Sequence, residues 1–423
     1  MKNRVVITSI GIMSALGFSA EEIVASLKDG GAAFERPAFD HKVCVCPVGD
    51  DFRLKDFTGR YKNARYLNRG AGFSVAAAMS ALKGANLAEQ MLAGAGLFVG
   101  CGSNMDIGGE FPEIRQGNLD RQTLAALWIL KFMPNTAAST ISDLVGIHGE
   151  NATVGTACSA SLQAIGEAFR KIKDGYLEVA LAGGGDSKLN PGGILGYRMA
   201  QALWTYEESG RFAASPGPLS PLHPSREDPS RHFGPFDRHR RGFIPGEGGA
   251  FFVLENLEHA KARSARILGE VCGFGAAMDG FNMTAPDPSG KWAEAAVRGA
   301  LDEAGLSEDQ IDVVSAHGTA TVLNDQMEAD LISRVFSGHK PYVIALKSRI
   351  GHLTGGCGAV ETAIGLTCLR NGFLPGIRNL DEPAFENINL VRSTQEISAE
   401  TMLVENFGFG GQNAALVVKR WKE

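Results

Sequence analysis

Alternating strand-like and helical segments predict an α/β protein whose sheets are mostly parallel and covered by helices on both faces. The strand-like runs are short, apolar on both alternating positions and often end in glycine. They cover residues 4–11, 95–103, 177–187, 249–256, 269–279, 311–319, 341–348 and 414–421. The helical patterns, often closed by the glycine expected just past a helix end, cover residues 19–30, 71–85, 161–175, 291–305 and 359–372.

Buried-type strands occur in both parts of the chain, which predicts two α/β halves, residues 1–255 and 256–423. Residues 206–234 are rich in Pro, Ser and Arg and have neither a helical nor a strand period. Because strand-like sequence resumes directly after them, we expect a long surface loop rather than a linker between domains.

Composition narrows the classes of function. With 44% hydrophobic residues the chain can bury one large core or two ordinary ones, and a formal net charge of −6 argues against nucleic acid as the main partner. No apolar run approaches the roughly 18 residues needed to span a bilayer. The seven scattered cysteines and the absence of a signal peptide predict reduced thiols in a cytoplasmic protein.

Cys158 stands between a β-prone run and a helical one in "NATVGTACSASLQAIGEAFRKI", residues 151–172. The first turn of a helix offers unpaired N–H groups and the positive end of the helix dipole, and both favour thiolate over thiol. The alternative is a small buried core residue, which describes most free cysteines.

Three further side chains leave the ends of strand-like runs in separate βα units. His317 follows the run "IDVVSA", and Lys347 and His352 follow "PYVIAL". A single strand-end histidine is more often a structural hydrogen-bonding group than a catalyst. However, open α/β sheets place ligands at the carboxyl ends of their strands, so the set predicts a shared crevice with Cys158. The glycine-rich turn "ENFGFGGQN", residues 405–413, adds consecutive backbone N–H groups.

Six segments of the chain resemble the β-ketoacyl synthases, which condense malonyl-carrier units in fatty-acid and polyketide synthesis. In the order of the family, and nearly end to end, they are "RVVITSIGIMSALG", "GTACSAS", "GPFDRHRRGFIPGEGGA", "HGTATVLND", "KSRIGHLTGGCGAVE" and "NFGFGGQN". The resemblance implies a thiolase-like fold, in which two similar α/β halves carry mixed, largely parallel sheets layered between helices as α-β-α-β-α.

The chemistry of such an enzyme accounts for these residue types. A cysteine accepts the acyl chain as a thioester that stays reactive. Loss of CO₂ from a malonyl thioester then leaves an enolate oxygen that two neutral imidazoles, His317 and His352, can stabilise through N–H donors. The resemblance implies a separate oxyanion site formed by the backbone N–H groups of Cys158 and Phe409. The Phe409 side chain is either a gate over the acyl pocket or a packed aromatic.

The resemblance also implies supporting roles for polar residues around the site. Lys347 supplies positive charge and pairs with Glu361, since a buried lysine without a partner would be unfavourable. Asp325 and Glu328 match acidic positions of the family, and we expect them to hold a loop rather than to transfer protons. The hydroxyl groups expected to bind phosphopantetheine belong to Thr319 and Thr321.

The chain departs from the family at several positions. Ala320 stands where the histidine loop usually has glycine, and Gln412 where threonine is common. Neither change removes a catalytic group, but both can reshape the acyl channel, which weakens any prediction of the substrate. Ser103 falls near a position that is often apolar and lines the acyl tunnel, which leaves a short or polar acyl chain open. Just after "QALWT", where relatives often carry a basic residue, residues 206–208 read Tyr-Glu-Glu.

The expected partner is an acidic acyl carrier protein, whose phosphopantetheine carries the substrates, so that neither a cofactor nor a metal is expected. Lys62, Arg65 and Arg69 are spaced at three and four residues and are candidates for docking the carrier; a solvated basic face is the alternative. A homodimer is expected, with a heterodimer also open, and neither nucleic acid nor membrane is an expected partner.

Three other functions share some of these motifs. A thiolase would need a second catalytic cysteine, and Cys357 fits packing better. An acetyl-CoA-primed synthase would need asparagine in place of one histidine. The non-enzyme alternative is a catalytically silent chain-length-factor-like subunit of a ketosynthase heterodimer, against which Cys158 argues.

Overall fold

A mixed sheet of eleven strands runs through the part of the chain described by this computed structural model, residues 2–31, 34–106, 126–205 and 233–422. Its strands are β1 (Val5–Met13), β2 (Gly96–Gly100), β5 (Asn151–Val154), β6 (Val179–Ser187), β7 (Glu247–Asn256), β8 (Gly269–Met278), β9 (Val313–Ser315), β10 (Tyr342–Ile344), β12 (Asn389–Leu390), β14 (Thr401–Gly408) and β15 (Gln412–Arg420). Two separate ribbons are β3 (Ile114–Arg115) with β4 (Asn118–Leu119), of which only the backbone is described, and β11 (Phe373–Leu374) with β13 (Gln395–Glu396).

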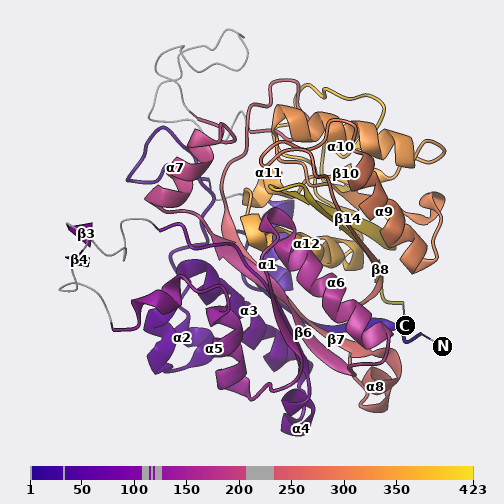
Figure 1. Cartoon of the computed structure of the whole chain (residues 1–423). Coiled ribbons are helices and arrows are strands. Elements are labelled where there is room, and N and C mark those ends of the chain that lie inside the picture. Colours follow the sequence, from indigo (N-terminus) through magenta and orange to yellow (C-terminus); the bar gives the residue numbers. More distant parts are fainter. Residues whose placement is uncertain are drawn as a thin grey trace.

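The helices cover both faces of this sheet (Figure 1). The α-helices are α1 (Ala20–Lys28), α2 (Lys55–Thr58), α3 (Arg69–Ala85), α4 (Glu89–Ala93), α5 (Thr136–Val145), α6 (Ala160–Lys173), α7 (Pro191–Met199), α8 (Leu257–Ala262), α9 (Lys291–Ala304), α10 (Val322–Val335), α11 (Lys347–Ile350) and α12 (Cys357–Arg370). The 3₁₀ turns are η1 (Lys62–Tyr66), η2 (Trp128–Lys131), η3 (Ala157–Ser159), η4 (Glu308–Gln310) and η5 (Thr354–Gly356).

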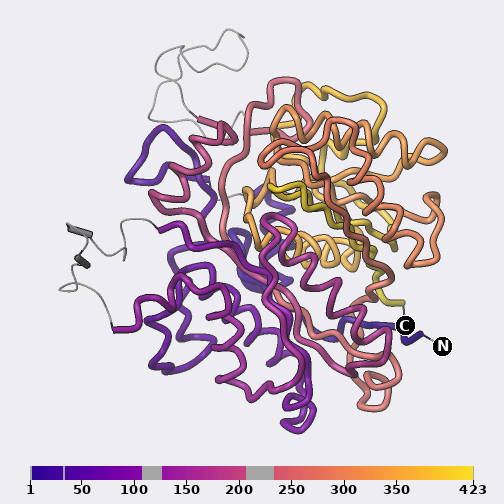
Figure 2. Tube along the Cα trace, viewed as in Figure 1, coloured from indigo at the N-terminus to yellow at the C-terminus, as the bar shows by residue number. Residues whose placement is uncertain are grey.

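The strand order repeats once along the chain. In the first half the order is β5-β2-β6-β7-β1, and in the second half it is β10-β9-β14-β15-β8, with β12 added at the outer edge. Each half has two antiparallel pairings next to its first strand and two parallel pairings beyond them. The first strands, β1 and β8, pair antiparallel and join the halves. Figure 2 shows the halves as separate regions of early and late sequence.

The predicted two-half α/β architecture is confirmed, and the described sheet contains five parallel and five antiparallel pairings. Parallel pairs are therefore half of the total rather than most of it. The reason is that the first and last strands of each half in chain order are antiparallel to both of their neighbours. These strands are β1 and β7 in the first half and β8 and β15 in the second. The boundary between residues 255 and 256 itself stays a prediction.

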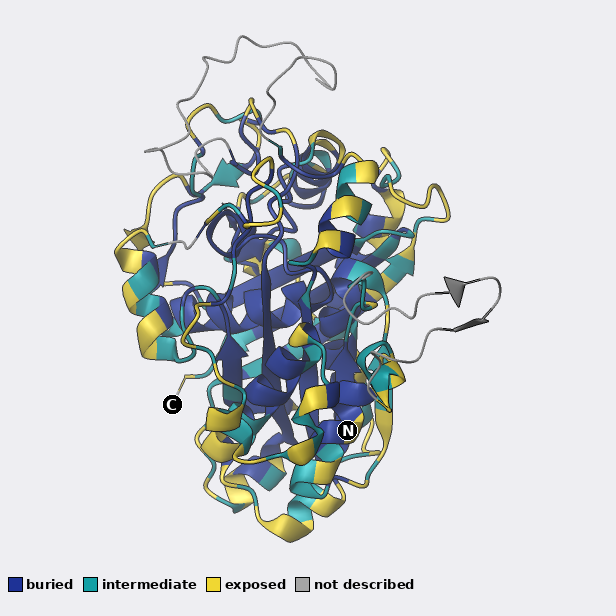
Figure 3. Cartoon of the chain, turned by 90° about the vertical axis from the view of Figure 1, so that its left-hand side faces the viewer, coloured by how far each residue is buried: buried dark blue, intermediate teal, exposed yellow. Residues whose placement is uncertain are grey.

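Two helices form the middle layer. Helices α6 and α12 contact strands of both halves, while α3 and α5 lie outside the first half and α9 and α10 outside the second. Every residue of α12 except Arg370 is buried. Apart from Glu361 and the terminal Arg370, this enclosed helix has only apolar or small side chains. Its backbone approaches α6 at Gly358, where an added Cβ would lie 2.5 Å from Leu162 Cβ. Figure 3 shows the resulting buried interior and the exposed outer faces.

Two elements near the site were not predicted. The polar segment after His317 is not among the predicted helical patterns, but Val322–Val335 forms α10. Its polar residues Asn324, Asp325 and Glu328 are buried toward the site, which hides the usual apolar period. Strand β14 includes residues 405–408 and β15 begins at Gln412, so the glycine-rich turn predicted at 405–413 is confined to residues 409–411. None of the described helices is long and apolar enough to cross a bilayer.

Candidate active site

Cys158 lies in the turn that joins β5 to α6. Ala157, just before it, has a φ of +48°, a conformation that is uncommon for a residue with a side chain. The η3 turn that holds Cys158 continues directly into α6, so the predicted place at a helix start is confirmed. The side chain is 8% exposed. A strained turn of this kind is found where the surrounding structure fixes a functional side chain.

The predicted cysteine and histidines meet in space. Cys158 Sγ and one ring nitrogen each of His317 and His352 lie within 4.8 Å of one another. The two imidazole rings are nearly perpendicular, at 89°, with 5.4 Å between their centroids. Residues separated by almost two hundred positions therefore share one buried cluster, as the strand-end argument predicted.

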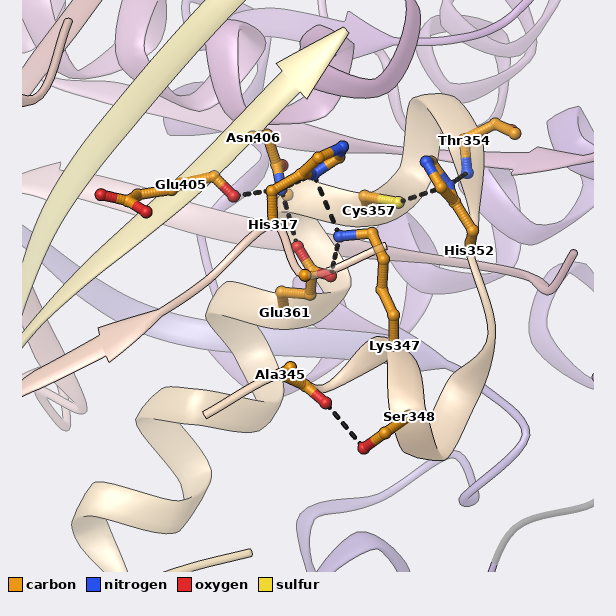
Figure 4. Close-up of polar contacts among 12 residues, drawn as sticks. His317, Ala345, Lys347, Ser348, His352, Thr354, Cys357, Glu361, Glu405 and Asn406 are labelled. Atoms are coloured by element: carbon orange, nitrogen blue, oxygen red, sulfur yellow. Dashed lines mark hydrogen bonds and ion pairs between the residues drawn. The ribbon is translucent and has the colours of Figure 1, made fainter. Parts of the chain in front are cut away.

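His317 is held by the ammonium group of Lys347. Lys347 Nζ lies 3.2 Å from His317 Nδ1 (Figure 4). An ammonium group can only donate, so Nδ1 accepts and the proton of the neutral ring is on Nε2. This contact fixes which nitrogen of His317 can donate to a ligand.

Lys347 is compensated by an anion from the middle layer. Its Nζ lies 2.5 Å from Glu361 Oε1, and both side chains are fully buried. Asn406, on β14, donates to the other carboxylate oxygen of Glu361 at 2.8 Å. The predicted Lys347–Glu361 pair is thus in contact, whereas Asn406 was missed because a residue in a strand gives no sequence signal of the side that it faces.

His352 is held by neutral groups instead. The backbone N–H of Thr354 donates to His352 Nδ1 at 3.0 Å, and Cys357 Sγ lies 3.3 Å from the same nitrogen. This histidine therefore also carries its proton on Nε2. Cys357 was expected only to pack, and its contact with His352 is an addition to that expectation.

Both imidazoles are neutral around pH 7. Burial, and then the positive charge of Lys347, hold the pKa of His317 well below its usual range. The same two causes lower the pKa of His352. Lys347 stays charged because the nearby anions, led by Glu361, outweigh the effect of its own burial and raise its pKa.

The Cys158 thiol behaves differently from the expectation drawn from its helix position. Burial raises its pKa to about 11, although the charge of Lys347 and a hydrogen bond from the backbone of Phe409 act in the opposite direction. Desolvation therefore outweighs the groups that favour the thiolate. The resting group is a protonated thiol.

Cysteine and histidine are also zinc ligands, and this trio is the one group of three or more such side chains that the described ranges bring together. A metal would need the lone pairs of the imidazoles. Since both Nδ1 atoms already accept hydrogen bonds, the Nε2 atoms bear protons. The arrangement therefore favours donation to an oxygen over coordination of a metal.

The backbone of Phe409 lies at Cys158. Its N–H bonds to the thiol, and the next residues, Gly410 and Gly411, have φ of +84° and +73°. The turn is fixed because Gly410 N–H donates to the carbonyl of Met283 at 2.8 Å. The half-buried Phe409 ring packs edge-on against Tyr197, with 6.2 Å between the centroids.

The loop of His317 is held by carboxyl groups on α10. Glu328 accepts from the backbone N–H groups of His317 and Gly318, at 2.5 and 2.8 Å. Asp325 accepts from the N–H groups of Phe236 and Ala320, at 2.8 and 3.2 Å. These contacts are those of residues that hold a loop.

Glu405, next to Asn406 on β14, is a fully buried carboxyl that was not predicted to belong to the site. Burial, and then the neighbouring Glu328, raise its pKa well above the usual value. Burial also raises the pKa of Glu328, to about 7. Two carboxyl groups in one dry site cannot both ionise, so Glu405 is neutral around pH 7.

Thr319 and Thr321, the residues predicted to bind phosphopantetheine, lie next to each other, and Thr321 also caps a helix. The hydroxyl oxygens of Thr319 and Thr321 are 2.9 Å apart. Thr321 is the N-cap of α10 and accepts from Asn324 N–H at 3.4 Å. Thr319 is 5% exposed, and Thr321 is more open.

The three proposed docking cations differ in their surroundings. Lys62 and Arg65 are exposed, and Arg65 lies over the Tyr66 ring. Arg69 instead makes a two-pronged ion pair with the buried Glu247, at 2.7 and 2.5 Å. A role for Arg69 in docking is therefore less direct than its spacing suggested, because its guanidinium is already paired.

The remaining positions singled out in the sequence are Ser103, Gln412 and the segment 206–234. Ser103 is exposed, and Gln412 begins β15 as a half-buried residue. Residues 206–232, which include Tyr206, Glu207 and Glu208, lie outside the described residues. The expectation of a long loop at 206–234 stays a prediction.

Comparisons with known proteins agree with this geometry. Residues 2–260 match the family described as "Beta-ketoacyl synthase, N-terminal domain", and residues 268–381 match "Beta-ketoacyl synthase, C-terminal domain". The "3-oxoacyl-[acyl-carrier-protein] synthase 2" of Vibrio harveyi is 30% identical, with 100% of each chain covered.

Solved structures give the same result. A β-ketoacyl synthase from Burkholderia phymatum STM815 has a TM-score of 0.85 at 30% identity, with 100% of both chains covered. The structure titled "The ishigamide ketosynthase/chain length factor" has a TM-score of 0.84 at 26% identity, again over 100% of both. The chain belongs to the β-ketoacyl synthase family. Its fold is the thiolase-like α/β fold, and its class is that of the acyltransferases that act as condensing enzymes.

The elevated pKa of Cys158 predicts its reactivity. The rate of its alkylation by iodoacetamide should rise about tenfold per pH unit and show no plateau up to pH ~10, because the thiolate is the nucleophile. Peptide mass spectrometry over this range measures the rate. In the charge-neutral variant Lys347→Met with Glu361→Gln, alkylation should be slower at each pH, since the larger influence removed is the cation. A plateau at pH 9 or below in the native enzyme would contradict the prediction.

Gly318 and Ala320, in the loop that follows His317, both have a positive φ. We expect them to differ in how well they tolerate substitution. Gly318→Ala should lower the free energy of unfolding by about 1–3 kcal/mol, because an added Cβ would lie 2.8 Å from Ala345 Cβ at a φ of +44°. Ala320, at a φ of +64°, should tolerate glycine within about 1 kcal/mol, since relief of backbone strain offsets the lost buried methyl group. Urea unfolding of both variants checks this, and equal losses would contradict it.

Proposed function

We propose that this enzyme loads an acyl group onto Cys158 and condenses it, with loss of CO₂, with the malonyl group of a malonyl-acyl carrier protein. The observation that carries the proposal is the cluster of one thiol and two neutral imidazoles within 4.8 Å, in which both rings are held with the proton on Nε2. A nucleophile and two preset donors are what this reaction requires.

The first step is transfer of the acyl group to Cys158. Its Sγ attacks the carrier thioester, a new thioester forms, and the old carbon–sulfur bond breaks. Cys158 loses one proton and the departing pantetheine thiolate gains one, so the step consumes no base overall. The N–H groups of Cys158 and Phe409 are our candidates for stabilising the negative oxygen of the tetrahedral intermediate.

The second step needs the imidazoles. When the malonyl carboxylate leaves as CO₂, the electron pair forms an enolate whose oxygen can accept from His317 and His352. The carbanion carbon then attacks the acyl carbonyl, the bond to Cys158 Sγ breaks, and the sulfur regains a proton from solvent. The imidazoles act best here as neutral donors, which agrees with their lowered pKa values.

Lys347 supports both steps without transferring a proton in this scheme. Its charge keeps His317 neutral and favours the Cys158 thiolate when it forms. Glu361 and Asn406 keep that charge in place. We assign Asp325 and Glu328 to holding the histidine loop.

The substrate arm and the partners follow from the same proposal. Thr319 and Thr321 are our candidates for binding phosphopantetheine, and the acyl carrier protein supplies that arm, so the reaction requires no cofactor or metal. We expect a homodimer. The pairing of a ketosynthase with a chain length factor in one structural relative keeps a heterodimer open. A cytoplasmic location stays a prediction.

A catalytically silent chain-length-factor-like subunit is the alternative function. It would not need a nucleophile, whereas Cys158 is present with both histidines next to it. Labelling of residue 158 therefore separates the two functions.

Incubation with an acyl-carrier substrate, or with cerulenin, should give a mass adduct on Cys158 and none in Cys158→Ala. Turnover of malonyl-carrier to the 3-oxoacyl product should fall about 10²- to 10³-fold in His317→Ala or His352→Ala. Cys272→Ala, on β8 and outside the cluster, is the matched control and should keep full activity. Absence of both the adduct and turnover in the native chain would favour the silent-subunit function.

Carrier docking gives a further prediction. The double variant Lys62→Glu with Arg65→Glu should raise the KM for the carrier, more strongly at low than at high salt, because exposed charges are screened by ions. Charge reversal at the exposed Lys340 is the control. Arg69 is left intact because its loss would strand Glu247. Unchanged kinetics at both salt concentrations would remove these residues from the docking surface.

A further inference from the structure

Asp186, at the end of β6, is a buried carboxylate that the proposed reaction does not use. Its side chain forms an ion pair with Lys188, and both are nearly inaccessible to solvent. The second oxygen, Oδ2, accepts from Thr354 Oγ1 at 2.5 Å and from the backbone N–H of Gly355 at 3.0 Å. The first half of the chain thus holds, through one carboxylate, the η5 turn of the second half.

The residue that Asp186 holds has a strained backbone. Thr354 has a φ of +48°, which is a genuine outlier for a β-branched residue. Such a conformation costs about 1–3 kcal/mol and persists only when its surroundings over-determine it. The space around it is also restricted, because an added Cβ on the next residue, Gly355, would lie 2.7 Å from the backbone nitrogen of Gly102.

The strained residue is also the one that orients a histidine. Thr354 N–H donates to His352 Nδ1 at 3.0 Å, which keeps the proton of the ring on Nε2. If this peptide turned away, the other tautomer would become accessible and would present a lone pair, not a proton, to an enolate oxygen. Cys357 Sγ, at 3.3 Å from the same nitrogen, is the weaker of the two donors.

We propose that Asp186, acting through the Thr354 hydroxyl, is a positioning residue that sets the tautomer of His352. The ammonium group of Lys188 pairs with the buried carboxylate, and Asp186 touches neither the substrate nor a reacting atom in this scheme. The inference rests on the proposed function, because it assigns His352 to the decarboxylation step.

The test compares two substitutions at Thr354 that share the backbone position. Thr354→Val keeps the branched shape and loses the hydroxyl, whereas Thr354→Ser keeps the hydroxyl. The Val variant should lower kcat for condensation about tenfold or more, with little change in KM for malonyl-carrier. Its rate of Cys158 acylation, followed by intact mass spectrometry without malonyl substrate, should be that of the native enzyme. The Ser variant should restore condensation.

The tautomer is read directly by ¹⁵N NMR of histidine-labelled enzyme. In Thr354→Val the ring nitrogen shifts of His352 should move away from the Nε2–H pattern, while those of His317 should stay in place. Should the Val variant fail to fold, the charge-neutral double variant Asp186→Ala with Lys188→Met removes the oxygen that accepts from the Thr354 hydroxyl. It should give the same split between acylation and condensation.

Three outcomes would overturn the inference: native condensation and unmoved His352 shifts in the Val variant, equal losses of acylation and condensation, or no recovery with Ser. The first would show that the hydroxyl does not set the tautomer, and the other two that Thr354 has only a structural role. If the native enzyme took up an acyl group but did not release CO₂ from malonyl-carrier, the proposed function would be wrong. The NMR comparison would still decide whether Asp186, through the Thr354 hydroxyl, sets the tautomer of His352.

Discussion

A single buried ammonium group organises this active site. Lys347 is fully buried, so its ammonium group is stabilised by the Glu361 carboxylate and not by water. That carboxylate in turn accepts a hydrogen bond from Asn406. Breaking a buried pair by removing one partner typically costs about 3–5 kcal/mol, because the other charge is left uncompensated. The three residues come from α11, α12 and β14. Their pairing therefore ties three elements of the second half together around His317.

The two histidines reach the same protonation state by different means. His317 faces a full charge at Nδ1, while His352 faces a peptide N–H and a thiol. A charge acts over several ångströms and tolerates small shifts, whereas hydrogen bonds from neutral groups depend on distance and angle. The neutral arrangement therefore needs a rigid turn, which is consistent with the strained backbone at Thr354.

Sequence patterns were sufficient for many of the strands and helices and for the main site residues, but not for α10 or β14. Strand-length apolar runs, and polar residues directly after them, gave the places of Cys158, His317, Lys347 and His352. Sequence failed where burial reverses the usual pattern. The carboxyl groups of Asp325 and Glu328 face inward to backbone N–H groups, so α10 did not look amphipathic. Asn406 and Asp186 lie within strands, where nothing in the sequence distinguishes a side chain that supports a site.

The repeated strand order has a consequence for how the molecule can work. The first repeat supplies the sulfur, and the second supplies the ammonium and both imidazoles. Neither half of the chain contains all of these groups. A shift of one half relative to the other by even an ångström would therefore move the Cys158 sulfur away from the ammonium and the imidazoles. Close-packed backbones, such as those of α6 and α12 at Gly358, resist such a slide. One strand order thus presents two dissimilar sets of chemical groups, and the packing between the halves is what keeps those sets together.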